Sequence, residues 1–268
     1  MNQVYDFKRI MLLARFKFGY HKKILLLSVM GYFALLFIIG FFIAYGNRNH
    51  VDTRPFYTIF HYIGLPVMMV VGSVLLAGRS FQEMNTPEKS TIQILLPASS
   101  FEKYIVHLFS TSILWMLFSF VSYHIFSLIF NGAWTAFYGY EFELFNGLKI
   151  FNVYMIAEII LGYFLLHSIF LLGAAAFKKY PMVKTVLAQF ILNWAYSILG
   201  FLVIIILFGS TENFGLKMDQ IDNILLEKGW FTLENIEYIA RLILKTATVL
   251  LAAAFYVTGY YKLKEREV

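Results

Sequence analysis

Four polar side chains lie within one long apolar stretch of the sequence, and their spacing gives them a common helix face. They are Gln189, Asn193, Tyr196 and Ser197, at positions i, i+4, i+7 and i+8. Amide and hydroxyl groups exchange hydrogen bonds, and an unpaired one is costly in hydrocarbon. The spacing therefore indicates either hydrogen bonds to a neighbouring helix or contact with a translocation path.

Other residue patterns give no support for catalysis or metal binding. The histidines His61, His107, His124 and His167 do not share a helix face at ligand spacing, and the chain has no cysteine. No HExxH, GxSxG or EExxxR motif occurs, and no Walker A phosphate loop is present. The sequence predicts no catalytic residue, no metal site and no cofactor bound by this chain.

The elements that carry these residues are predicted to be membrane helices. Of 268 residues, 60% are hydrophobic and only 14% are charged, with a mean hydropathy of +0.69, which is far outside the range of soluble domains. About 20 helical residues cross a hydrocarbon core. Six apolar runs are long enough, at 24–45, 56–77, 105–130, 152–177, 183–208 and 239–261. The predicted fold class is all-α, a polytopic membrane protein with six transmembrane helices.

The distribution of lysine and arginine predicts the orientation. Basic residues precede the first span, follow the fourth and end the chain, whereas the connections after the third and fifth spans are acidic. The positive-inside rule makes the basic side cytoplasmic, so both termini are expected there. Anionic lipid headgroups, rather than nucleic acid, are the expected partner of the net charge of +6.

The polar insert between the second and third spans, residues 78–104, is the longest internal cytoplasmic connection. Its first part, SFQEMNTPEKS, predicts a short polar helix or turn, and Ser99 or Ser100 is suited to cap the third span. Ile92, Ile94, Leu95 and Leu96 would not be left in water without a surface that buries them. A partner protein is therefore favoured over a solvated loop.

The amino-terminal residues 1–23 predict a helix that lies in the membrane interface. Val4, Phe7, Met11, Ala14 and Phe18 recur at helical spacing, while basic side chains project elsewhere. The alternative is a basic orientation signal with no docking role.

A glutamate, a threonine, two leucines, a proline and two serines follow one another through the insert, as Glu83, Thr91, Leu95, Leu96, Pro97, Ser99 and Ser100, before Glu102 and Lys103. This pattern resembles the cytoplasmic loop of ABC-2-type transporter permeases, although Ser90 stands where that family often has glycine. The segment LLGAAAFKKYPMVKT, residues 171–185, resembles the second cytoplasmic turn of the same family.

The resemblance implies the transmembrane subunit of a bacterial ABC exporter in the cytoplasmic membrane, with 1–23 as a connecting helix and 24–268 as the permease domain. It implies a second permease copy and a separate ABC ATPase subunit that binds ATP and Mg. The residues implied to couple to the ATPase are Glu83, Thr91, Leu95, Leu96, Pro97, Glu102 and Lys179. It also favours the path for the polar face at 189–197. Aromatic residues make up 19% of the chain, which favours a lipid, peptide or other amphipathic cargo.

The outer excursion, residues 209–238, contains MDQIDNILLEKGW, which predicts a short helix stopped by Gly229, with Thr232 as the cap of the last span. The resemblance implies short re-entrant helices here, and a solvated loop is the alternative. Arg241 and Lys245 lie one turn apart near the predicted outer boundary, where they are suited to contact a lipid phosphate. Glu158, on the fourth span, is expected to be paired or to reach the interface.

Two other classes remain open from the sequence alone. One is a polytopic membrane enzyme, for which no nucleophile or base can be named, and the other is a membrane scaffold without transport activity. An ATPase encoded beside this gene would favour the transporter over both.

Overall fold

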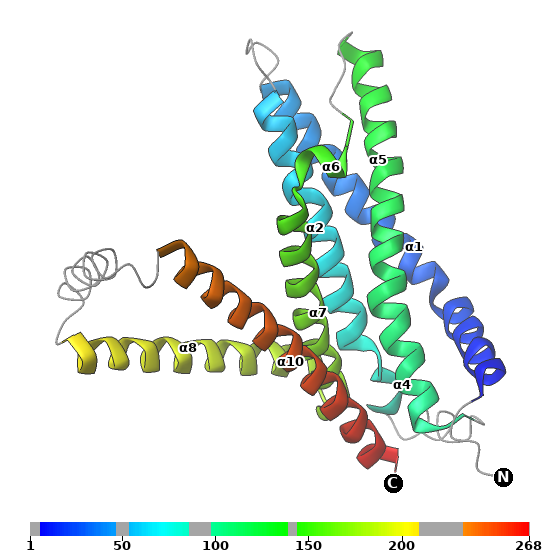
Figure 1. The fold of residues 1–268 in the computed structure, drawn as a ribbon. Helices are drawn as coiled ribbons and strands as arrows, with labels where there is room; N and C mark the ends of the chain where they lie inside the picture. Colours follow the sequence, from blue (N-terminus) through cyan, green and yellow to red (C-terminus); the bar gives the residue numbers. More distant parts are fainter. Residues whose placement is uncertain (1–5, 47–53, 86–97, 139–143, 209–232, 268) are drawn as a thin grey trace.

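The structure is a computed structural model that describes residues 6–46, 54–85, 98–138, 144–208 and 233–267. Its regular elements in these ranges are all helical (Figure 1). In chain order they are α1 (Phe7–Gly46), α2 (Arg54–Arg79), the 3₁₀ turn η1 (Gln82–Asn85), α4 (Ser100–Phe109), the π-helical turn η2 (Ser110–Leu114), α5 (Trp115–Tyr138), α6 (Gly147–Ile150), α7 (Val153–Ala176), α8 (Pro181–Phe208) and α10 (Leu233–Glu267).

Six stretches of the described helices are long and apolar enough to cross a membrane, which confirms the predicted number. They are Leu26–Gly46, Ile59–Met84, Ser100–Phe137, Val153–Ala176, Pro181–Val203 and Tyr238–Arg266. The third combines α4, η2 and α5, and α2 continues through Pro66 without a break. The chain is therefore an all-helical, multi-pass membrane protein by length and composition.

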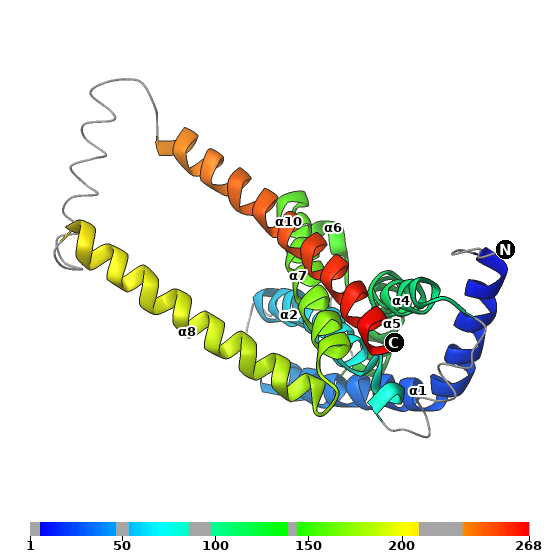
Figure 2. The ribbon, with the colours of Figure 1, turned by 90° about the horizontal axis from the view of Figure 1, so that it is seen from below.

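The first helix differs from the expectation of a separate amino-terminal element that ends at residue 23. α1 is one helix of 40 residues, about 60 Å at 1.5 Å per residue, which is about twice a hydrocarbon core. The segment contains no proline, so nothing in it forces a break. Figure 2 shows that α1 curves and that its first turns leave the line of the remainder.

The third span begins at the predicted cap, and α10 begins at Leu233, the position that follows the predicted cap Thr232. α4 begins at Ser100 because Ser99 caps it, with the Ser99 hydroxyl accepting the Glu102 N–H at 3.2 Å and the Glu102 carboxylate accepting the Ser99 N–H at 2.8 Å. This reciprocal arrangement is a capping box. α10 begins at Leu233 and runs to Glu267, so the end of the predicted excursion is already helical. Residues 209–232, with the expected short helix and its cap, lie outside the described residues.

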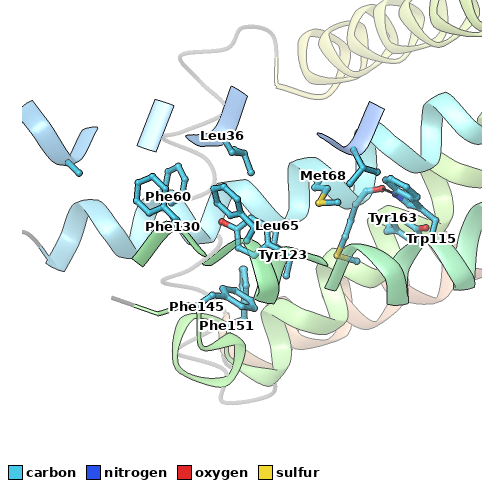
Figure 3. Packing of buried hydrophobic residues seen from close by; sticks show 14 of the residues in the cluster. Leu36, Phe60, Leu65, Met68, Trp115, Tyr123, Phe130, Phe145, Phe151 and Tyr163 are labelled. Carbon is cyan, nitrogen blue, oxygen red and sulfur yellow. Dashed lines mark hydrogen bonds between the residues drawn. The ribbon is translucent and has the colours of Figure 1, made fainter. Parts of the chain in front are cut away.

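Apolar and aromatic side chains of α1, α2, α5 and α7 fill the larger core (Figure 3). In this core the Trp115 ring of α5 packs directly against Gly72 of α2. A Cβ added to Gly72 would lie 2.0 Å from the indole ring. The same indole N–H donates to the Met69 carbonyl at 3.1 Å. Small residues allow such contacts between membrane helices, so Gly72 fixes how α2 and α5 pack.

Several segments that are distant in the sequence lie at one end of the helices. The start of α1, η1, the start of α4, the turn between α7 and α8, and the end of α10 gather there (Figures 1 and 2). These are the segments that carry the basic residues, as the charge distribution predicts. α10 packs along α7, whereas α8 leaves the other helices and exposes almost all of its described side chains.

Candidate functional site

A buried carboxylate joins the starts of α1 and α4 at the gathered end. Glu102 has no exposed surface, and one of its oxygens accepts hydrogen bonds from the Arg9 guanidinium at 2.9 and 3.2 Å. The same oxygen accepts the backbone N–H of Asp6 at 2.8 Å, and the other oxygen serves the capping box with Ser99. We call these four residues the α1–α4 junction. Because Glu102 lies between the helices, its charge holds α1 against α4.

A second contact between α1 and α4 lies two turns further along α1. The Lys17 ammonium contacts Nε2 of His107, and the His107 ring lies edge-on against Phe81 with centroids 4.7 Å apart. An ammonium group can only donate, so Nε2 must accept and the ring proton must lie on Nδ1. This contact extends the attachment of α1 to the end of α2 as well as to α4.

The π-helical turn η2 leads from this contact into a buried polar chain. The Thr111 hydroxyl lies 2.7 Å from the His107 carbonyl and 2.8 Å from Nε2 of His167, and Nδ1 of His167 lies 2.9 Å from the Tyr256 hydroxyl. The Tyr256 hydroxyl also lies 3.2 Å from the Phe164 carbonyl, which can only accept. The three shorter contacts each receive a proton when Tyr256 donates to His167, His167 to Thr111, and Thr111 to the His107 carbonyl. The chain thereby connects α4, α7 and α10. π-helical turns occur frequently at functional sites.

Hydrogen bonds to backbone carbonyls fix the same helices to one another. Tyr104 of α4 donates to the Tyr256 carbonyl at 2.7 Å, and Tyr163 of α7 donates to the Ser112 carbonyl in η2 at 2.7 Å. At the end of α10, Arg266 donates to the carbonyls of Ala174 and Ala175 at 3.0 and 3.3 Å. A motion of α4 would therefore be transmitted to α7 and α10.

The residues predicted to couple to an ATPase fall into three groups. Thr91, Leu95, Leu96 and Pro97 lie outside the described residues. Glu83, in η1, and Lys179, in the turn before α8, both lie at the gathered end, and Lys179 is exposed. Glu102 is fully buried in the α1–α4 junction, so it has no surface with which to contact another protein directly.

The polar face predicted for the fifth span is present on α8. Gln189 Nε2 donates to Asn193 Oδ1 at 3.4 Å, and the Ser197 hydroxyl donates to the Asn193 carbonyl at 2.9 Å. Asn193, Tyr196 and Ser197 are exposed, and Gln189 is half-buried. Among the described residues, the hydrogen bonds of this face stay within α8. It therefore does not tie α8 to another described helix of the same chain.

The two cations predicted to contact a lipid headgroup have different surroundings. Lys245 of α10 lies 3.4 Å from the carboxylate of Glu158 on α7, so Glu158 is paired, as one of its two expected alternatives required. This pair also explains part of the contact between α7 and α10. Arg241 is exposed one turn earlier on α10, and its headgroup contact stays a prediction.

Several of these contacts could not be predicted from the sequence. His167 and Tyr256 are 89 positions apart, and Arg9 and Glu102 are 93 apart, so no spacing rule could have joined them. Among the described residues, no group of three or more histidines and carboxylates is suited to hold a metal ion. The polar groups described here form hydrogen bonds and ion pairs between helices.

Searches of protein-family models, curated proteins and solved structures give no match to this chain.

Proposed function

We propose that this chain is the permease subunit of an ATP-driven exporter of the ABC-2 type, in which a separate ATPase subunit drives the movement of its helices. The observation that carries the proposal is the gathering of Glu83, Lys179 and the start of α1 at one basic end of the helices. In the sequence, η1 directly precedes residues 86–97, which hold the apolar part of the insert. An ATPase bound at this end would contact all of them together.

The hydrogen bonds at this end supply a route by which such a contact moves the helices. A push on the insert reaches α4 directly, because the insert ends at the Ser99 cap. The α1–α4 junction passes the displacement to α1, and the chain through Thr111, His167 and Tyr256 passes it to α7 and α10. In this proposal Glu102 is a positioning residue that keeps α1 and α4 moving as one body.

The exposed helix α8 supports a paired arrangement of two permease chains. Its polar face at Asn193 has no partner helix among the described residues, and a second copy would supply one or enclose a path beside it. The cytoplasmic membrane, with both termini inside, follows from the basic end under the positive-inside rule. A lipid, peptide or other amphipathic cargo is proposed from the aromatic content of the chain, 19% of its residues.

Affinity purification from native membranes, followed by mass spectrometry, tests the proposal. We expect an ATPase with a Walker A motif in stoichiometric amount, and Glu83→Ala or Leu95→Asp should lower its recovery several-fold. Asn193→Leu is the matched control, since it lies on α8 and should leave recovery unchanged. Full ATPase recovery with both insert variants would reject the coupling role, and absence of any ATPase would favour the enzyme or the scaffold.

A further inference from the structure

An apolar groove of about 500 Å³ lies between α1 and α5. Phe33, Ala34 and Phe37 of α1 and Ile125, Phe126 and Ile129 of α5 line it. Its volume falls within the range of about 300–1,000 Å³ that is typical of small-molecule sites.

The floor of the groove is built from aromatic pairs that join the two helices. Phe33 and Phe126 are stacked, with centroids 5.1 Å apart and planes 5° from parallel, and Phe37 meets Phe130 edge-on at 5.2 Å. Further along α1 the helices approach closely, because a Cβ added to Gly40 would lie 2.8 Å from the Phe130 ring. The groove therefore lies on the amino-terminal side of Gly40 along α1, and the packed aromatic rings form its floor.

The chemistry of the groove suits a hydrocarbon chain. Its one polar lining side chain, Ser122, donates to carbonyls of its own helix, at 2.6 Å to Phe118 and 3.3 Å to Ser119. A hydroxyl bonded in this way offers little to a ligand. Ile38, Ile125 and Ile129 are each more than half exposed at the rim, so the groove opens sideways to the membrane.

Two lysines earlier on α1 indicate a charged group for the other end of a ligand in the groove. Lys22 and Lys23 are exposed and lie 11 residues before Phe33 and Ala34. Eleven residues are close to three helical turns, about 17 Å along the helix, so each lysine precedes a groove residue by nearly whole turns of α1. That distance is close to half of a hydrocarbon core of about 30 Å. About 17 Å is therefore the separation expected between a phosphate at the membrane surface and the end of an acyl chain near the bilayer centre.

We propose that an anionic phospholipid binds along α1, with its phosphate on Lys22 and Lys23 and one acyl chain in the groove between α1 and α5. Two lysines beside a membrane attract anionic headgroups, while the apolar floor holds the chain in place. The site differs from the Arg241 position, which is on α10. It does not depend on whether the chain is a permease, since only membrane insertion is required.

The test reconstitutes the chain in nanodiscs of phosphatidylcholine with one-fifth phosphatidylglycerol and counts retained lipids by native mass spectrometry after detergent release. Ala34→Trp fills the groove and should lower retention of both lipids about fivefold or more. Lys22→Gln with Lys23→Gln should remove the preference for phosphatidylglycerol and reduce its retention roughly tenfold. The matched controls are Ala254→Trp on exposed α10 and Lys178→Gln with Lys179→Gln, and both should retain the wild-type preference.

Three results would overturn the proposal. Retention by Ala34→Trp equal to that of Ala254→Trp would show that no chain occupies the groove. A preference for phosphatidylglycerol that survives in the Lys22 and Lys23 variant would show that these lysines do not hold the phosphate. Loss of a dimer mass in Ala34→Trp, with lipid retained, would show that a second copy covers the groove. The side chains of Lys22 and Lys23 are exposed, so replacing them should not disturb helix packing. The double lysine variant therefore tests the proposal even if Ala34→Trp fails to fold.

Discussion

The α1–α4 junction predicts a measurable coupling between Arg9 and Glu102. Arg9→Met keeps an unbranched apolar stem and removes two hydrogen bonds to a fully buried carboxylate. Net contributions of hydrogen bonds to charged groups are about 1.5–3 kcal/mol each. The Arg9 side chain is 36% exposed, so the lower end applies. We expect Arg9→Met to lower the free energy of unfolding by about 3 kcal/mol.

A double-mutant cycle distinguishes the interaction energy of the Arg9–Glu102 ion pair from other destabilising effects of each substitution. Glu102→Gln keeps an oxygen that accepts the Ser99 N–H, since glutamine also completes a capping box, and leaves Arg9 able to turn toward water. Arg9→Met with Glu102→Gln leaves no unpaired charge. Its cost should therefore be smaller than the sum of the two single costs by about 1.5 kcal/mol, within the range of about 0.5–3 kcal/mol measured for contacting residues.

Two measurements check this prediction. Reversible unfolding in mixed micelles gives the four free energies of the cycle. Hydrogen exchange over residues 6–20 reports whether the start of α1 detaches, and an opening easier by about 1.4 kcal/mol speeds exchange about tenfold. Lys8→Met is the matched control, since it removes a neighbouring exposed charge outside the junction. Additive single costs, or unchanged exchange in Arg9→Met, would refute the reasoning.

Three further predictions concern the membrane helices. Gly72→Ala should lower the midpoint of thermal unfolding through overpacking worth about 1–3 kcal/mol, whereas Gly162→Ala, where an added Cβ meets nothing within 4 Å, should not. Asn193→Leu should leave thermal stability within about 0.6 kcal/mol of wild type and alter cargo-stimulated ATP hydrolysis; lower stability with unchanged stimulation would contradict this. Glu158→Gln and Lys245→Gln should each reduce the yield of folded protein, and the double variant should recover it; a double variant no better than either single would exclude their pairing.

Much of the helical plan was predictable because membrane helices are defined by local composition. The six apolar runs each became a helix, and the Ser99 cap was readable because a capping box spans only four residues. The extent of α1 was not predicted, because a change from an amphipathic to an apolar pattern was taken as a boundary. A helix continues through such a change when no proline or competing cap interrupts it.

The contacts between helices could not be predicted from the sequence, for a different reason. Glu102 was assigned to coupling with an ATPase, although in the structure it binds Arg9 of the same chain. His167 was set aside because the histidines share no helix face at ligand spacing, whereas its hydrogen-bond partners, Thr111 and Tyr256, lie on other helices. Such pairings depend on the order in which helices pack, and a single sequence carries no periodic signal for that order.

The polar face of α8 now has a narrower interpretation than the sequence allowed. If this polar face joined α8 to other helices of the same chain, we would expect Asn193 to form a hydrogen bond with α7 or α2, which are described helices that contact α8. Among the described residues its hydrogen bonds remain within α8, and Asn193, Tyr196 and Ser197 are exposed. Polar side chains are costly to leave against lipid, so we expect further partners from outside the described helices. Under the proposed function, a second permease chain or a hydrated path beside it would supply them, and both would place α8 at the centre of the assembly rather than at its edge.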